Sequence, residues 1–228
     1  MAMRLVIHAG LHKTASTTFQ RICYNARREG VQAGVLYPEL MFQDVFTFQH
    51  SYLMWSLQEG RRLAVFSCLR QFFEEAQRLG CGAVLLSGED FENFLVDASM
   101  HRLWEQLVQA AGFSAPEWWI VERDPVSRFA SLYAEYAKHG ICVAVQAWAA
   151  SVKRTGWFTL STENCHYAMV IDLPRLLPAF RVRCAGNVSL MPFDGFTGMQ
   201  PAGAAFLMQC FGLHWLAGAL LLVTLCIY

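Results

Sequence analysis

The sequence predicts one α/β domain of three layers, in which helices cover both faces of a mainly parallel central sheet. Short apolar runs alternate along the chain with segments whose apolar residues recur at helical spacing, a pattern typical of parallel strands that are buried on both faces. Of the 228 residues, 55% are apolar and 16% are charged. This composition predicts a sizeable core and excludes disordered, collagen-like and coiled-coil chains.

The first unit of the chain is expected to be a strand, a tight turn and a helix. The apolar run 5–7 predicts the strand, and Gly10 begins the turn. From residue 14 to about residue 28, apolar residues recur at i, i+3, i+4 and i+7, which predicts a helix that ends at Gly30. Residues 31–60 are aromatic and irregular.

Strands and helices continue to alternate through the rest of the chain. Asp124-Pro125 is a typical helix start, with an N-cap side chain before a proline at the first helical position. The expected elements are a helix over 63–76 that ends near Gly80, a strand over 83–86, a helix around 103–111 that ends near Gly112, a strand over 118–121, a helix over 125–138, a helix around Trp148, a short helix over 172–180, and a closing strand or strand pair over 181–184 and 188–191.

Charge and cysteine content set the class of protein. The 18 Lys and Arg balance the 18 Asp and Glu, so nothing in the total charge favours nucleic acid as a partner. The eight cysteines form no CxxC pair, which indicates reduced thiols in a cytoplasmic protein and no metal cluster. The N-terminus is interrupted too early by His8 and Gly10 to be a signal peptide.

The turn after the first strand, GLHKTASTT, is a candidate anion site. It combines a helix N-terminus at the carboxyl end of a strand with a lysine and several hydroxyls, which suits phosphate or sulfate. The pattern GxxxxGK[ST] is met only in part, because His12 precedes Lys13. The alternative is a polar helix start without a ligand. The candidate binding residues of this turn are Gly10, His12, Lys13, Thr14, Ala15, Ser16, Thr17 and Thr18.

A second candidate segment, RDPVSRFAS, follows the strand over 118–121. Arg123 at the strand end and Ser131 in the next helix have the chemistry to hold a second phosphate. Taken alone, this segment is better explained by Arg123 pairing with Glu122 or Asp124 at the domain surface, with Ser131 an ordinary helix residue.

Together, HAGLHKTASTT and RDPVSRFAS resemble the two phosphate-binding segments of sulfotransferases that use 3′-phosphoadenosine 5′-phosphosulfate (PAPS). The first is also similar to the HxGxHKTGTT form of bacterial carbohydrate-type relatives, with Ala15 and Ser16 in place of Gly-Thr. The resemblance implies a P-loop-NTPase-like fold over residues 1–203 and transfer of a sulfuryl group to a hydroxyl acceptor, a carbohydrate, without a required metal. It implies that Lys13 and the turn hold the 5′-phosphosulfate, and that Arg123 and Ser131 hold the 3′-phosphate.

The sequence leaves two candidates for the general base and two alternatives to the sulfotransferase function. Glu89 follows the strand over 83–86 and is the first candidate base, His50 in the aromatic segment is the second, and His8 is expected to be structural. A P-loop-like kinase or hydrolase would use the same Lys13 turn with a magnesium-holding aspartate after a strand. A third alternative is an inactive nucleotide-binding module.

The C-terminal segment 204–228 carries no charge, and the last charged residue is Asp194. Its start is expected to be a helix that packs on the domain. Its end is long and apolar enough for a membrane segment, although Gln209 and His214 interrupt it. Three alternatives remain for this segment: contact with a membrane, packing on the domain, or a chain end altered by truncation.

Overall fold

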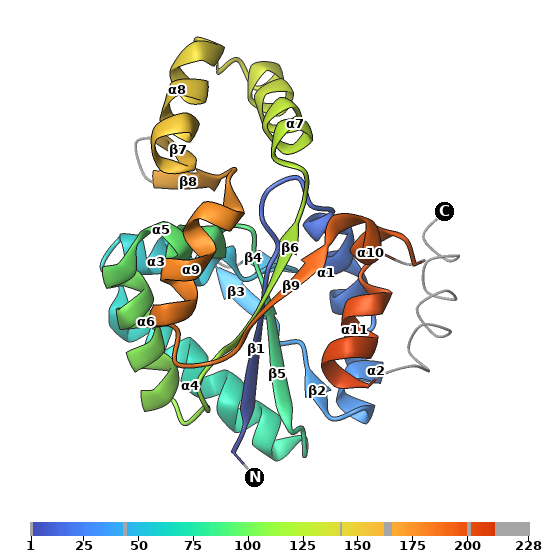
Figure 1. The fold of residues 1–228 in the computed structure, drawn as a ribbon. Helices are drawn as coiled ribbons and strands as arrows, with labels where there is room; N and C mark the ends of the chain where they lie inside the picture. Colours follow the sequence, from blue (N-terminus) through green and yellow to red (C-terminus); the bar gives the residue numbers. More distant parts are fainter. Residues whose placement is uncertain (1, 43–44, 142, 162–165, 200–201, 213–228) are drawn as a thin grey trace.

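Figure 1 shows the computed structural model, which describes residues 2–42, 45–141, 143–161, 166–199 and 202–212. Five strands form the central sheet in the order β2-β5-β1-β6-β9, and every neighbouring pair is parallel. Their bounds are β1 Arg4–Ala9, β2 Val35–Leu36, β5 Ala83–Ser87, β6 Glu117–Glu122 and β9 Val188–Pro192. The prediction of an α/β fold with a mainly parallel sheet is confirmed.

Helices cover both faces of this sheet because β1 is apolar on both sides. Leu5 and Ile7 pack in one core cluster with residues of α4, α6 and α9. Val6 packs in the opposite cluster with residues of α1, α10 and α11, and Figure 1 shows these two groups of helices on either side of the sheet. The bounds are α1 Ser16–Asn25, α4 Arg62–Arg78, α6 Ala98–Ala110, α9 Leu173–Arg183, α10 Phe193–Thr197 and α11 Ala204–Phe211.

A third apolar cluster lies beyond the carboxyl end of β6. It contains Leu132, Trp148, Phe158 and Met169, and the Trp148 and Phe158 rings are stacked with their centres 4.4 Å apart. These residues join α7 Pro125–Lys138, α8 Val145–Thr155 and the antiparallel pair β7 Trp157–Ser161 and β8 His166–Val170. Figure 1 shows them as one group above the sheet, and α7 joins this group through Leu132.

Several predicted elements are confirmed. Helices cover residues 63–76, 103–110, 125–138 and Trp148, and strands cover residues 83–86, 118–121 and 188–191. Asp124 caps α7 by accepting a hydrogen bond from Ser127 N at 2.7 Å. Gly80 and Gly112 follow their helices with φ of 70° and 105°, the left-handed conformation that glycine adopts readily.

Two expectations are wrong. The first helix does not continue to Gly30, since it ends at Asn25 and a separate helix, α2 Arg27–Gln32, contains Gly30. Residues 181–183 are not a strand but the last turn of α9, whose buried residues Leu173, Leu177 and Phe180 have helical spacing. The alternation of arginines with apolar Val182 imitated a strand, although Val182 is 90% exposed.

Other elements lie where the sequence predicted none. These are α3 Ser51–Gln58, the short pair β3 Leu40–Phe42 and β4 Val45–Thr47, the 3-10 turn η1 Asp90–Glu92, α5 Asn93–Val96, and the strands β2, β7 and β8. The segment described as irregular, 31–60, therefore contains a helix whose Leu53, Met54 and Leu57 enter the main core.

The described part of the C-terminal segment is a helix that packs on the sheet, as expected for its start. Phe206 and Leu207 of α11 are buried in the core cluster around Val6. Residues 213–228 lie outside the described part of the chain. Among the described residues, no helix has the length and apolar character to cross a bilayer. The described cysteines Cys23, Cys68, Cys81, Cys184 and Cys210 are free thiols.

Candidate functional site

The turn after β1 is built by its own hydroxyl groups. Thr14 Oγ1 donates to Leu11 O at 2.5 Å, and Ser16 Oγ donates to Gly10 O at 3.0 Å. Both side chains are buried, and a Cβ at Gly10 would collide with Ser16 Oγ. Gly10, Thr14 and Ser16 therefore shape the turn, and the Thr14 hydroxyl does not face its open side.

Two residues of the turn have left-handed backbone conformations. Lys13 has φ of 67° and Ala15 has φ of 63°, values that cost roughly 1–2 kcal/mol for a residue with a side chain. Ala15 is also the N-cap of α1, and its methyl group cannot accept a hydrogen bond from the free N–H groups of the helix. The turn thus presents backbone donors at the start of α1, which suits an anion.

Lys13 and Arg123 meet at the carboxyl ends of the neighbouring strands β1 and β6. Arg123 Nη1 donates to Lys13 O at 2.7 Å, and its guanidinium lies 4.8 Å from the centre of the Phe193 ring. Lys13 Nζ lies 3.4 Å from Glu135 Oε2 of α7. The two cations that the sequence placed at separate strand ends therefore belong to one site.

A cavity of about 440 Å³ lies over this turn. Of the predicted site residues, it is lined by His12, Lys13, Ala15, Ser16, Thr17, Glu89 and Arg123. The residues that sequence reasoning missed are Leu132, Glu135, Tyr136, His139 and Phe193. A second cavity of about 530 Å³ shares Arg123 and Phe193 with the first, and its other walls include Glu122, Asp124, Ser127 and Asp194.

Five predicted site residues line neither of these cavities: Gly10 and Thr14, which shape the turn, and Thr18, Ser131 and His50. Thr18 is exposed on α1, and Ser131 lies half-buried within α7. His50 is 1% exposed; its Nε2 lies 3.0 Å from Pro38 O, and its Nδ1 accepts from Ser87 N at 3.0 Å. Burial lowers the pKa of His50 to about 4. Of the two candidate bases, Glu89 lines the cavity over the Lys13 turn and His50 does not, and Ser131 lies outside the linings of both cavities.

A buried network of charges lies directly behind the turn. His12 Nδ1 is 2.5 Å from Glu92 Oε1, and Arg128 Nη2 donates to Glu92 Oε2 at 2.6 Å. Arg128 Nε also donates to His12 O at 3.0 Å. Glu92 and Arg128 are almost completely buried. The network therefore joins the β1 turn, η1 and α7, and it fixes the wall of the cavity.

The charges of this network determine the protonation of its members. Burial opposes a charged His12, but Glu92, Asp90 and Glu89 outweigh it and raise the pKa of His12 to about 9. Burial also opposes ionisation of Glu92, yet Arg128 and His12 outweigh it, so the pKa of Glu92 is lowered. Near neutral pH the network consists of a carboxylate between two cations.

Glu89 lies at the edge of the network and faces the cavity. Its Oε2 is 3.6 Å from His12 Nε2. Burial raises the pKa of Glu89, and the charge of His12 only partly opposes this. A carboxylate with a raised pKa at a cavity wall is suited to accept a proton from a bound hydroxyl.

His8 is structural, as expected. It is buried, Nδ1 lies 2.8 Å from Ser87 Oγ, and the ring stacks on Phe196.

The burial of Arg128 was missed, although the sequence contained a sign of it. Arg128 lies one turn before buried Leu132, on the apolar face of α7. A charged residue at such a position requires a buried partner.

Replacing Ala15 by glycine should stabilise the protein. Ala15→Gly relieves the strain of the left-handed backbone conformation, whereas the greater freedom of glycine in the unfolded chain offsets part of this gain. The free energy of unfolding should therefore rise by about 0.5–1 kcal/mol. Urea unfolding measures it. The matched variant Ala130→Gly lies on the exposed face of helix α7 and should lose about 1 kcal/mol. A loss for both variants would contradict the strained turn.

Stability should fall as the pH rises through the pKa of His12. That value, about 9, lies above the ordinary 6.5, so the contribution of His12 is complete below about pH 6.5 and is lost as the pH passes 9. The size is on the order of 3 kcal/mol. The variant His12→Gln should lack this component of the pH dependence, whereas His166→Gln, at an exposed position of β8, should retain it. An unchanged pH profile in His12→Gln would exclude the assignment.

Comparisons with known proteins do not assign this chain to a family. No protein-family profile matches the chain, and no curated protein matches it.

Proposed function

We propose that this protein is a sulfotransferase that moves a sulfuryl group from PAPS to a hydroxyl group of a carbohydrate acceptor. One observation carries the proposal. Lys13 and Arg123 lie 110 residues apart in the chain, yet they line one cavity together with the carboxylate of Glu89. Two cations and a base are the groups that transfer from a bisphosphorylated donor to a hydroxyl requires.

The position of the cavity in the sheet supports a nucleotide-like donor. After β1 the chain continues to β2 on one side of the sheet, and after β6 it continues to β9 on the other. Open α/β sheets bind ligands where the connections diverge in this way, at the carboxyl ends of the strands. In the proposal, the 5′-phosphosulfate lies over the Lys13 turn and the 3′-phosphate lies against Arg123, whose remaining N–H groups suit two phosphate oxygens.

Each side chain has a defined part in the proposed transfer. The acceptor oxygen attacks sulfur, the bond from sulfur to the bridging phosphate oxygen breaks, and 3′,5′-adenosine bisphosphate leaves. Glu89 takes the proton of the acceptor hydroxyl, and Lys13 stabilises the charge that develops on the leaving phosphate. Thr17 lines the cavity with an exposed side chain, so its hydroxyl is available to the phosphosulfate.

Binding of the donor replaces the ion pair between Lys13 and Glu135. The Glu135 side chain is 41% exposed, and an ion pair in such a position contributes little to stability. Glu135 nevertheless adds a negative charge to the wall of the cavity. Its removal is therefore expected to strengthen the binding of an anion.

Phosphoryl transfer is the second candidate because of the position of Glu89. This carboxylate follows β5, the neighbour of β1, and lines the same cavity as Lys13. Carboxylates at such a position are also ligands for magnesium with a bound nucleoside triphosphate. The two functions differ in nucleotide preference and in their need for magnesium.

Calorimetry without magnesium should show that 3′,5′-adenosine bisphosphate binds more tightly than ADP or ATP. Lys13→Ala and Arg123→Ala should each weaken the bisphosphate about tenfold or more, since each removes a charged contact. The control Lys153→Ala, at an exposed position of α8, should bind the bisphosphate like the parent. Glu135→Gln should bind it more tightly.

Tighter binding of ATP than of the bisphosphate would contradict the proposal, and magnesium-dependent ATP binding would favour phosphoryl transfer. Transfer from PAPS to a panel of carbohydrates should be lost in Glu89→Gln while bisphosphate binding is retained. Bisphosphate binding by the parent without any transfer would instead identify an inactive nucleotide-binding module.

A further inference from the structure

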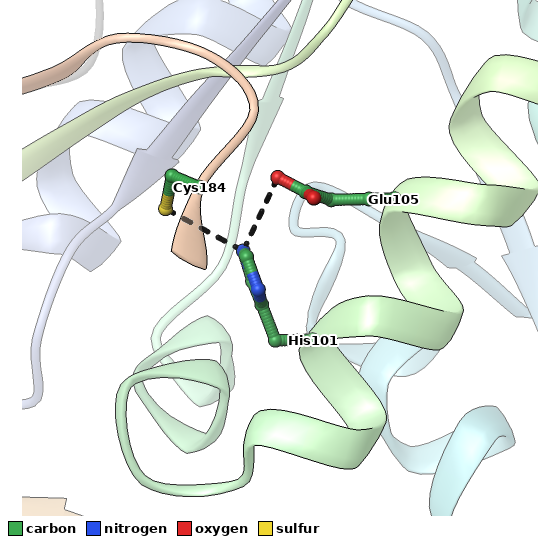
Figure 2. Close-up of side chains that lie close together, drawn as sticks. All are labelled: His101, Glu105 and Cys184. Atoms are coloured by element: carbon green, nitrogen blue, oxygen red, sulfur yellow. Dashed lines mark hydrogen bonds and ion pairs between the residues drawn. The ribbon is translucent and has the colours of Figure 1, made fainter. Parts of the chain in front are cut away.

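A second group of reactive side chains lies between helix α6 and the end of α9, away from the Lys13 turn. Figure 2 shows that His101, Glu105 and Cys184 point toward one another. His101 Nε2 lies 3.6 Å from Cys184 Sγ and 3.5 Å from Glu105 Oε1. The three ligand atoms all lie within 4.8 Å of one another.

Two elements position these side chains. His101 and Glu105 are one turn apart on α6, so they share a face of the helix. Cys184 directly follows α9 and precedes β9, at the end of the sheet opposite to the Lys13 turn. Ala185 N donates to Glu105 Oε1 at 2.9 Å, and such a bond orients a carboxylate as an outer-sphere partner orients a metal ligand.

Hydrogen bonds alone do not satisfy this group. Nε2 of a neutral imidazole carries either one proton or one lone pair, yet both Cys184 Sγ and Glu105 Oε1 lie within 3.6 Å of it. If Nε2 donates to Glu105, the Cys184 thiol lacks its acceptor at Nε2. If Nε2 accepts from the thiol, it has no proton to donate to the Glu105 carboxylate. A cation at the centre satisfies all three atoms.

The spacing and chemistry of the ligands fit zinc. Zinc binds nitrogen and oxygen at about 2.0–2.2 Å and sulfur at about 2.3 Å, so tetrahedral ligands lie roughly 3.3–3.6 Å apart. Two of the three separations already have this length. Thiolate and imidazole select zinc over magnesium or calcium.

The charge and the surroundings of the group agree with a bound divalent ion. A thiolate, a carboxylate and a neutral imidazole together neutralise the charge of Zn²⁺. The His101 ring packs against Phe180 and Trp118, whose ring centres lie 5.0 and 5.6 Å away. This apolar wall keeps water from one side of the group and strengthens electrostatic attraction there.

We propose that His101, Glu105 and Cys184 bind one zinc ion, with water as the fourth ligand. The ion ties α6 to the connection between α9 and β9, and thus fixes the start of an edge strand of the sheet. The site is independent of the sulfotransferase proposal, because it lies at the opposite end of the strands and shares no residue with the cavity over Lys13.

Metal titration of the purified chain, after treatment with a chelator, tests the site. One equivalent of Zn²⁺ should bind and raise the midpoint of thermal unfolding, because the ion binds the folded state. Co²⁺ in place of Zn²⁺ should give a thiolate-to-cobalt charge-transfer band. Cys184→Ser should lose this band and weaken Zn²⁺ binding at least tenfold, on the order of the loss that disturbing a metal site causes.

The matched variant is Cys68→Ser, which removes another half-buried free thiol, on α4. It should keep the band, the zinc affinity and the thermal shift. Glu105→Gln should weaken Zn²⁺ binding while the cobalt band persists at higher metal concentration. Failure of the parent to bind Zn²⁺, or equal binding by the parent and Cys184→Ser, would overturn the site.

Discussion

Glu92 is completely buried, and its carboxylate contacts three segments that are distant in the chain. Oε1 meets His12 Nδ1 of the β1 turn, and Oε2 accepts from Arg128 Nη2 of α7 and from Val170 N of β8. A buried carboxylate without partners would be very costly, so the fold forms with two cations around it. Removal of one partner from such a group costs about 3–5 kcal/mol, which makes these contacts a strong constraint on the structure.

The arrangement of the candidate site follows from this constraint. Arg128 Nε also binds His12 O, so α7 and the β1 turn cannot shift independently. The same helix carries Glu135, the partner of Lys13, and begins two residues after Arg123, which binds Lys13 O. The two cations proposed to hold the donor are thus positioned by a charge that does not line the cavity. The proposed zinc site fixes the opposite end of the sheet through α6 and Cys184.

The sequence predicted what depends on local pattern and missed what depends on contacts between distant residues. Strands such as 83–86 and helices such as 125–138 follow from periodicity and caps, and the strand ends placed Lys13, Glu89 and Arg123 together. The partner of Arg128 could not be predicted, because Glu92 lies 36 residues earlier in a short turn. The inward hydrogen bond of Thr14 was equally hidden, since it depends on the strained turn. The segment over 181–183 misled because exposed Val182 imitated strand alternation.

The ionisation of His12 tests most directly whether the Glu92 carboxylate organises the site. Nitrogen-15 NMR of the histidine side chains, followed through a pH titration, reports the protonation of each ring nitrogen. The His12 ring should carry protons on both nitrogens at pH 7 and titrate near pH 9, and in Glu92→Gln its titration should shift toward lower pH. A neutral His12 ring at pH 7, or an unchanged titration in Glu92→Gln, would contradict the account.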